Sequence, residues 1–541
     1  MRSLSVTVVL TFGAAFFVLL AGCDGQQLAG QNNLQEPGIS ADEQPNQKSA
    51  KPIRWELGPT VAGDAVRNIV FREPSSSKAR SGERRPKTVV PRPMIQGAPE
   101  ALCIGEDGSQ YVGGTFKGNK DFDTGPGVDF HEAMGAEDGF VTRFDRDGKY
   151  CWTQTFGAKE RVDVRGIAVS RGVVYAVCEE LDGHVAIVAV DCATGAPKAG
   201  FGHSGCQMFR CGQFDFAAGI RSRGDTIYVA IRCRNILAGK LPPLVAGEPA
   251  PAIAWPDYSF TVVLAIDGTN GSAVISFGTK GVQTIGNALA LTGPPSAKVA
   301  NTNVEPFGLA VSGSTLYVFG RCDGNSLGIG GQGSIIGERM RSKGFIAALN
   351  IQTGTAVSGF GQTGLVVMDR DAAEVADTVV SEGLLYVTGC WQHAGHDNAY
   401  LAAMDASTGR LSQQFGTAGM KVLGPWEWES GWSIRVKGQV AYITGGYMDR
   451  ETEGVFVAAF DRTSGLPVKA FGSGGTQLIE GLKWGEQGRI EPFGNTLFLA
   501  ARTEPSLEKK HEVKIGETIF THDGVSGFLF RLRTDGRVVD K

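Results

Sequence analysis

The chain has 541 residues, more than the roughly 100 to 200 of an ordinary domain, so it contains either several domains or one large repetitive architecture. Glycine is unusually frequent, at 76 residues, whereas 42% hydrophobic and 20% charged residues are ordinary for a globular protein. This composition argues against a disordered, collagen-like or polytopic membrane protein, and the net charge of −4 offers no basic surface for nucleic acid.

The N-terminus is predicted to be an export signal. Arg2 is followed by an apolar run over residues 6–20, which is shorter than the about 20 residues that a membrane-spanning helix needs. The run ends in the sequence LAGC, residues 20–23, which resembles the lipobox of bacterial lipoproteins. The resemblance implies a signal peptide over 1–22 and lipidation at Cys23. The exported protein is then anchored to the periplasmic or cell-surface side of a bacterial membrane by its N-terminal lipid.

Residues 23–96 are expected to form a flexible, disordered linker between the lipid and a folded body. This segment is rich in Gln, Asn, Pro, Ser and charged residues, and it cannot bury enough apolar surface to offset the entropy lost on ordering. Two apolar islands, 53–57 and 68–71, are candidates to dock on the body.

From about residue 97 to the C-terminus the sequence repeats every about 65 residues. Each repeat begins with a strand, a tight turn and a second strand that carries an aromatic residue. The aligned aromatic residues are Tyr111, Tyr175, Tyr228, Tyr317, Tyr386, Tyr442 and Phe498.

A second hairpin follows the first in every repeat. Its first strand ends in a residue whose side chain can hydrogen-bond the turn backbone, and a glycine follows where a positive φ is needed. We interpret these residues as turn formers: Asp145, Asp191, Asp267, Asn350, Asp405 and Asp461. The second strand ends in Phe-Gly except in the last repeat, whose outer strand is therefore short. An N-terminal strand such as 88–90 can pair there and close the ring, or the repeats can close by packing alone.

Two hairpins per repeat predict a four-stranded sheet, and seven such sheets bury their faces by packing in a ring. The predicted fold is all-β: a seven-bladed β-propeller over 97–541. The first repeat, with YVGG and DGFVTRFDRDGKYCWTQTFG, resembles the SBBP repeats of bacterial propellers. Later repeats, with DASTG and FGTAG, resemble delta-sixty-type repeats and, more distantly, quinoprotein repeats. The resemblance implies a fold and leaves the activity open.

Nine cysteines remain besides Cys23, and an odd number leaves at least one thiol outside any disulfide. Their spacing does not match a metal site, so most are expected to be small core residues. Cys206 and Cys211 are the first pair to consider for a disulfide.

The connections between hairpins and between blades are long, uneven and on one face of the ring, which is where binding is expected. The segments 391–398 and 424–432 place aromatic rings beside carboxylates, as in sugar-binding clefts and glycosidases. The candidate ligand-binding residues are Trp391, His393, His396, Asp397, Trp426, Glu427, Trp428, Glu429 and Trp432. The alternative is that the tryptophans pack between blades and the polar residues are solvated.

A calcium site is the single cofactor candidate. Asp121, Asp123, Asp129 and Glu132 have the spacing of oxygen ligands in an EF-hand loop. Pro126 stands where that loop needs glycine, and strands are expected on both sides of it. No other cofactor is predicted.

The first functional hypothesis is a membrane-anchored binding module without catalysis, whose partner is an envelope protein or glycan. A second hypothesis is a carbohydrate-active hydrolase or lyase that uses Glu427, Glu429, His393 or His396. A third is an envelope scaffold without a small ligand. Nucleic acid is not an expected partner.

Overall fold

In the computed structural model every described residue lies within residues 51–541. Described are residues 70–72, 94–95, 97–180, 183–209, 216–236, 255–286, 303–330, 332–368, 373–393, 396–450, 452–482, 488–502, 511–522 and 527–539. All regular elements in these ranges are β-strands. No helix long and apolar enough to cross a bilayer occurs in them. Cys23 and the predicted signal peptide lie outside the described residues.

Seven antiparallel sheets of four strands each form the blades. In blades 1 to 6 the innermost strand comes first in the chain and the outermost strand comes last, whereas the outermost strand of blade 7 comes from the N-terminal side. Blade 1 is β3 (Ala98–Ile104), β4 (Gln110–Phe116), β7 (Asp138–Phe144) and β8 (Tyr150–Gly157). Blade 2 is β9 (Val162–Ser170), β10 (Val173–Glu180), β11 (Val185–Asp191) and β12 (Cys206–Phe209). Blade 3 is β13 (Phe216–Arg223), β14 (Thr226–Ile236), β15 (Trp255–Asp267) and β16 (Val282–Gly286). Blade 4 is β17 (Asn303–Ser312), β18 (Thr315–Ile329), β19 (Gln332–Asn350) and β20 (Leu365–Val367).

Blades 5 and 6 follow the same chain order, and blade 7 takes its outermost strand from the N-terminal side. Blade 5 is β21 (Glu374–Ser381), β22 (Leu384–His393), β23 (His396–Asp405) and β24 (Met420–Val422). Blade 6 is β25 (Trp428–Lys437), β26 (Val440–Met448), β27 (Glu453–Asp461) and β28 (Thr476–Glu480). Blade 7 is β29 (Gly488–Phe493), β30 (Thr496–Arg502), β33 (Gly527–Arg533) and β2 (Met94–Ile95).

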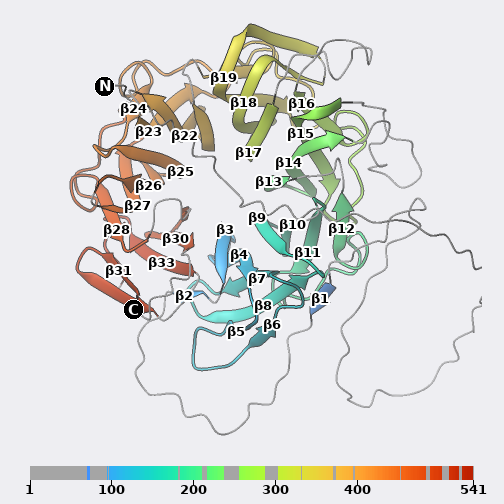
Figure 1. The fold of residues 1–541 in the computed structure, drawn as a ribbon, viewed down its shortest axis with the longest axis vertical. Coiled ribbons are helices and arrows are strands. Elements are labelled where there is room, and N and C mark those ends of the chain that lie inside the picture. Colours follow the sequence, from blue (N-terminus) through green and yellow to red (C-terminus); the bar gives the residue numbers. More distant parts are fainter. Residues whose placement is uncertain are drawn as a thin grey trace, which may run out of the picture. The chain divides into compact units, whose positions relative to one another are not determined.

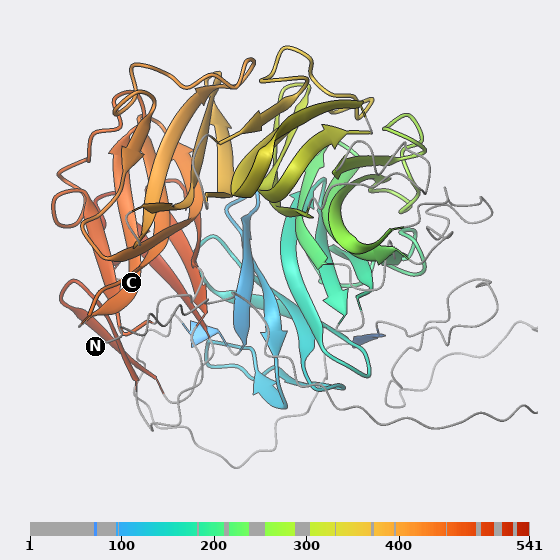
Figure 2. The same ribbon diagram turned by 45° about the horizontal axis from the view of Figure 1, so that its top comes forward.

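The blades form a closed ring. Each innermost strand contacts the innermost strand of the next blade, and β29 of blade 7 contacts β3 of blade 1. Figure 1 shows β3, β9, β13 and β17 around the centre of this ring, and Figure 2 shows the same ring tilted. The predicted all-β, seven-bladed propeller is confirmed.

An N-terminal strand closes the ring, as expected, although a few residues later than 88–90. In blade 7 the outermost strand is β2, whose Met94 and Ile95 pair with Phe528 and Gly527 of β33. Residues 88–90 lie outside the described residues. The island at 68–71 also docks in part, because β1 (Val70–Arg72) pairs with β8 as a fifth strand of blade 1.

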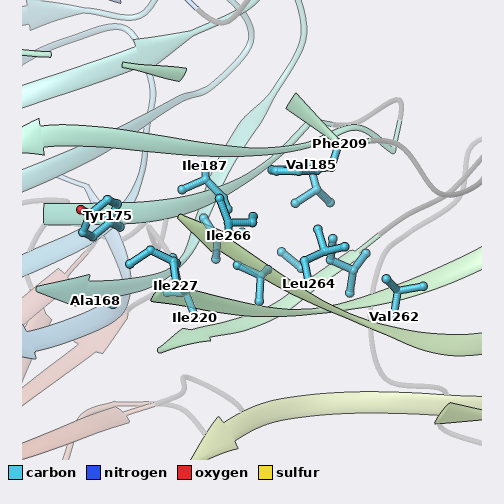
Figure 3. Close-up of a cluster of buried hydrophobic side chains, with 14 of the residues drawn as sticks. Ala168, Tyr175, Val185, Ile187, Phe209, Ile220, Ile227, Val262, Leu264 and Ile266 are labelled. Atoms are coloured by element: carbon cyan, nitrogen blue, oxygen red, sulfur yellow. The ribbon is translucent and has the colours of Figure 1, made fainter. Parts of the chain in front are cut away.

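Neighbouring blades share hydrophobic cores because both faces of each sheet are apolar. Figure 3 shows one such core, in which Tyr175, Val185 and Ile187 of blade 2 meet Ile220 and Leu264 of blade 3. A four-stranded sheet has two apolar faces to cover, so each blade depends on both of its neighbours.

The repeated tyrosine links one blade to the next. Tyr228 in blade 3 donates its hydroxyl hydrogen to the carbonyl of Ile351 in blade 4 at 2.8 Å, and its ring lies 5.7 Å from that of Phe277. The same inter-blade hydrogen bond runs from Tyr175 to Gly268, from Tyr317 to Ala406 and from Tyr386 to Arg462. The motif that marks each repeat in the sequence is therefore part of the blade interface.

The Phe-Gly motif makes a second link. The Gly278 N–H donates to the Thr353 carbonyl in the turn of the next blade at 2.7 Å. Gly354 of that turn has a φ of +68°, and a Cβ there would lie 2.8 Å from the Gly278 nitrogen. Only glycine fits both requirements. The predicted turn role of the Asp and Asn residues is confirmed, since Asp267 Oδ1 accepts the Thr269 N–H at 2.7 Å and Asp405 Oδ1 accepts that of Thr408 at 2.8 Å.

Cysteines are mostly core residues, as expected. Cys178, Cys206 and Cys322 are buried free thiols, whereas Cys151 is exposed. Because Cys206 is free, the structure contains no Cys206–Cys211 disulfide, and Cys211 itself lies outside the described residues.

Long connections are on one face, as predicted, and three of them are partly β-structure. In blade 1, β5 (Asn119–Asp121) and β6 (Phe130–Glu132) form a separate hairpin. In blade 4 the hairpin of β18 and β19 extends far enough to pair β18 with β16 of blade 3. In blade 7, β31 (His511–Ile515) and β32 (Thr518–His522) form a hairpin that pairs with β28 of blade 6. The second and third of these hairpins tie neighbouring blades together on the long-loop face.

Candidate functional site

Residues 391–398 continue a hairpin instead of forming a loop, contrary to the expectation from sequence. Trp391 pairs with Asn398, Gln392 with Asp397 and His393 with His396, so β22 and β23 extend almost to the turn. The hairpin carries His396 and Asp397 on the long-loop face, where the sequence placed them.

Two of the predicted site tryptophans are in the core. Trp391 is 7% exposed and its ring lies 5.2 Å from that of Tyr400, within the core shared by blades 4 and 5. Trp432 is 9% exposed, in the core of blades 6 and 7. For these two residues the alternative interpretation, packing between blades, describes what the structure shows.

The accessible part of the site lies between blades 5 and 6. His396 is exposed and meets the ring of Trp428 edge-on, with 5.8 Å between ring centroids. Trp426 is half-buried and packs on Tyr447 at 4.6 Å and on Phe456 at 5.9 Å. We call the surface of His396, Trp426, Glu427, Trp428 and Arg450 the aromatic platform.

The polar edge of the aromatic platform is an ion pair. Glu427 Oε1 lies 3.4 Å from Arg450 Nε, and the side chain of Arg450 is 87% exposed. The sequence reasoning missed Arg450 and the supporting Tyr447. Both follow the YITGG strand of the same repeat, so the strand-to-strand register of blade 6 was the signal that could have found them.

Glu429 is buried beneath the platform, with 1% of its surface exposed. Its Oε1 accepts the Trp426 backbone N–H at 2.7 Å, and Gly424 lies so close that a Cβ there would be 2.4 Å from this oxygen. Its Oε2 has no hydrogen-bond partner among the described residues. Burial raises the pKa of Glu429 to about 7, against the opposing effect of the Trp426 N–H. Glu429 thus anchors the 424–428 loop from below.

The remaining members of the predicted set are less defined. Asp397 is half-buried, and burial raises its pKa while His396 lowers it. For His393 the structure describes only the backbone pairing with His396.

The four calcium candidates lie on the β5–β6 hairpin, and their oxygens serve the protein itself. Asp121 Oδ1 accepts the Asp129 N–H at 2.9 Å, and Asp123 Oδ1 accepts the Gly125 N–H at 2.7 Å. Asp129 Oδ2 accepts the Tyr150 hydroxyl and lies 3.1 Å from His131 Nε2, while Glu132 is exposed.

Hydrogen bonds from the chain thus occupy the carboxylates that calcium needs. Within the described residues no group of three or more His, Cys, Asp or Glu side chains is arranged to hold a metal. The strands β5 and β6 flank this loop where an EF-hand has helices, as expected from the sequence.

Comparisons with known proteins concern the fold alone. No protein-family model and no curated protein matches the chain, so the resemblance to SBBP and delta-sixty repeats stays a prediction. Similar solved structures include the phage phi92 endosialidase, at 11% identity over 83% of this chain and 68% of that chain, with a TM-score of 0.33. Apo AztD from Citrobacter koseri has 10% identity over 81% of this chain and 90% of that one, with a TM-score of 0.30. A prolyl endopeptidase has 9% identity over 81% and 51%, with a TM-score of 0.38.

Proposed function

We propose that the protein is an exported, lipid-anchored binding module that holds an envelope glycan on the aromatic platform without catalysing a reaction. Sugars present C–H faces that pack on aromatic rings and hydroxyl groups that hydrogen-bond to planar carboxylate and guanidinium groups. The platform supplies both: the indoles of Trp426 and Trp428, and the Glu427–Arg450 pair beside them.

One observation favours binding over catalysis: the carboxyl group with the strongly raised pKa is enclosed, and the accessible groups are aromatic rings and an ion pair. Glu429 is 1% exposed and bonded to the loop above it, so it does not reach a ligand on the surface. Glu427 is accessible, but its carboxylate is engaged in the ion pair with Arg450. A glycosidase needs two carboxyl groups that face one bond from opposite sides.

The hydrolase hypothesis keeps one point in its favour. A carboxyl group with a pKa of about 7 is suited to donate a proton at neutral pH, and Glu429 has that property. It can act only if the 424–428 loop moves away. Incubating the protein with any glycan it binds, and measuring new reducing ends, decides between the two: release that disappears in E429Q indicates an enzyme.

The anchor is part of the proposal and has its own test. We expect C23S to move the protein from the membrane to the soluble fraction after cell fractionation, because the thiol that accepts the lipid is gone. C151S, which changes an exposed thiol of the propeller, is expected to stay with the membrane. Equal membrane retention of both variants contradicts the anchor at Cys23.

The binding experiment uses the full chain extracted from membranes in detergent, a glycan array and isolated cell-wall sacculi. W428A and H396A are expected to weaken glycan binding at least about fivefold, because truncating an aromatic contact at the centre of an interface typically costs more than 1 kcal/mol. F493A is the control, since Phe493 is a 37% exposed aromatic residue at the end of β29, by the short turn to β30.

Three outcomes count against the proposal. Glycan binding that W428A and H396A leave unchanged places the site elsewhere. Binding of an envelope protein in place of a glycan, lost in W428A, changes the ligand class. Absence of both kinds of binding in the wild-type protein leaves the scaffold hypothesis.

A further inference from the structure

The innermost strands bring charged residues from four different blades to the axis of the ring. Arg435 of β25 is the hub: its Nη1 lies 2.8 Å from Asp377 Oδ2 of β21, and its Nη2 lies 2.6 Å from Glu491 Oε1 of β29. Asp377 also accepts the Ser433 hydroxyl and the Ile434 N–H, both at 3.1 Å. The two carboxylates are thus used by Arg435 and its own strand.

Two further arginines lie on innermost strands and have no carboxylate partner among the described residues. Arg221 of β13 donates from Nη1 to the carbonyl of Ile220 at 2.8 Å, and no carboxylate oxygen in the described part of the chain lies within 4.0 Å of its nitrogens. Arg489 of β29 has neither a hydrogen bond nor an ion pair from its side chain among the described residues. Both side chains are half-buried.

The strand register places Arg221 and Arg435 at equivalent positions of their blades, because Arg221 pairs with Tyr228 of β14 and Arg435 pairs with Tyr442 of β26. The guanidinium of Arg221 is acted on by the charges of Arg435, Asp377 and Glu491. In the ring, β13 and β25 are separated by β17 and β21 on one side and by β29, β3 and β9 on the other. Neighbouring strands cannot bring these two arginines together, so they face each other over the axis. We call Arg221, Asp377, Arg435, Arg489 and Glu491 the axis cluster.

The axis cluster carries more positive than negative charge. Its three guanidinium groups meet two carboxylates, and the one that both carboxylates serve is Arg435. The charge of Glu100 also acts on Arg489, but this carboxylate is paired with Arg165 and Arg502. Burial and the neighbouring positive charge of Arg435 lower the pKa of Arg221 and of Arg489, while the carboxylates act in the opposite direction. Desolvated guanidinium groups without acceptors are costly for a protein to keep.

Solvent nevertheless reaches the cluster. The side chain of Arg435 is 17% exposed and that of Glu491 is 21% exposed. Asp377, at 4%, lies deeper. Arg221 and Arg489 are half-buried as well, so a small ion from the solvent can reach their donors.

We propose that the axis cluster is a binding site for a small oxyanion, a carboxylate or phosphate group, held by the guanidinium groups of Arg221 and Arg489. A planar guanidinium presents its N–H donors as a fork that matches two oxygens of such a group. The anion satisfies the donors that the carboxylates leave unused and balances the surplus charge. This site is separate from the aromatic platform, which lies at the long-loop end of blades 5 and 6.

The experiment titrates the full chain in detergent with inorganic phosphate and, separately, with succinate, by calorimetry and by thermal melting, against sodium chloride of equal ionic strength. Phosphate or succinate is expected to bind saturably and to raise the melting temperature, because a ligand that binds only the native state stabilises it by RT ln(1 + [L]/Kd), where [L] is the free ligand concentration. R221Q and R489Q are each expected to weaken the binding about tenfold or more, since each removes charged donors.

Arg410 provides the matched control, because it is an exposed arginine in a turn of blade 5, and R410Q is expected to bind like the wild type. W428A is likewise expected to keep anion binding, which separates this site from the glycan site. In anion-free buffer R221Q and R489Q are expected to be at least as stable as the wild type, since an unpaired buried charge is lost.

A response to phosphate alone assigns a phosphate group, and a response to succinate alone assigns a carboxylate. No saturable heat and no change in melting with either ion overturns the proposal. Undiminished binding by the R221Q/R489Q double variant overturns it as well.

Discussion

At the scale of single residues, Glu429 stands out because it is an acid enclosed under the surface that it supports. One carboxylate oxygen holds the Trp426 N–H and the other is without a partner among the described residues. Ionisation inside such an enclosure is unfavourable, which is why the pKa rises to about 7 from the ordinary 4.5. The conformation of the 424–428 loop is thereby coupled to pH.

We predict that Glu429 makes the protein less stable as pH rises. Between pH 4.5 and 7 the unfolded chain loses the proton of this carboxyl while the folded chain keeps it, so the free energy of unfolding falls over this window and levels off above it. The fall from this group is at most about 3 kcal/mol. E429Q is expected to lack it, as measured by urea denaturation at pH 5 and pH 8.

E427Q serves as the comparison for this prediction, because Glu427 is accessible and paired with Arg450. Its pH profile between 5 and 8 is expected to run parallel to that of the wild type. A wild-type profile that E429Q does not flatten shows that Glu429 titrates normally.

At the scale of elements, the blade interface is a recurrent unit in which one tyrosine, one Phe-Gly and one turn meet. Tyr228 shows the arrangement: its ring lies against Phe277 of its own blade and its hydroxyl group reaches Ile351 of the next blade. Burying the carbonyl of that turn requires a donor, and the tyrosine provides it. The aromatic residue of each repeat therefore serves the neighbour as well as its own blade.

We predict that Y228F lowers the free energy of unfolding by about 1 to 3 kcal/mol, because the buried Ile351 carbonyl loses its donor while the ring packing is kept. Chemical denaturation monitored by circular dichroism measures the change. Y442F is the matched control, since the Tyr442 hydroxyl has no hydrogen bond among the described residues and its ring packs on Phe471 in the same way. Equal losses in both variants contradict the role of the inter-blade hydrogen bond.

At the scale of the whole molecule, two segments about 430 residues apart in the chain, β2 and β33, pair to complete blade 7. β2 supplies the outermost strand of blade 7, and Ile95 is 2% exposed in a core with Leu102 of blade 1 and Phe498 and Leu529 of blade 7. An open ring exposes two apolar sheet faces, so a strand that joins first and last blades stabilises all seven.

We predict that I95D destabilises the protein by about 3 kcal/mol or more, because a charge enters an apolar core and β2 leaves β33. Thermal melting measures the loss, and hydrogen exchange is expected to speed up in Gly527–Arg533. Val422 is the control: it also lies on an outermost strand, β24, but is 44% exposed, so V422D is expected to change stability by less than about 0.5 kcal/mol. Unchanged exchange in β33 after I95D contradicts closure by β2.

The architecture was predictable because its signals are local and repeated. Each Asp-to-Gly turn is formed by residues only a few positions apart. Seven copies of the same two hairpins predict seven sheets, and packing these sheets in a ring buries the apolar faces of all of them. The closing strand was predicted in kind but placed at 88–90 instead of Met94–Ile95. Short apolar stretches near the N-terminus are alike in sequence, and the geometry of the ring decides which one reaches β33.

The candidate site was predictable only in location. The sequence placed His396, Trp426, Glu427 and Trp428 on the long-loop face. It named Trp391 and Trp432 as binding candidates with packing between blades as the alternative, and both are in the core. Both faces of a blade are apolar. The sequence around a tryptophan near a strand end therefore does not distinguish a side chain that packs in the core from one on the surface.

By itself, the sequence determined the all-β class, the seven blades, the turn residues and the face on which long connections lie, because these follow from interactions between residues that are close along the chain. The tertiary structure alone decided which strand closes the ring, which carboxyl group is enclosed and which arginines meet at the axis. Arg221, Arg435 and Arg489 are separated by up to about 270 residues in the chain and come together only because the innermost strands form a ring. Contacts of that range depend on the closed ring, and no local pattern encodes them.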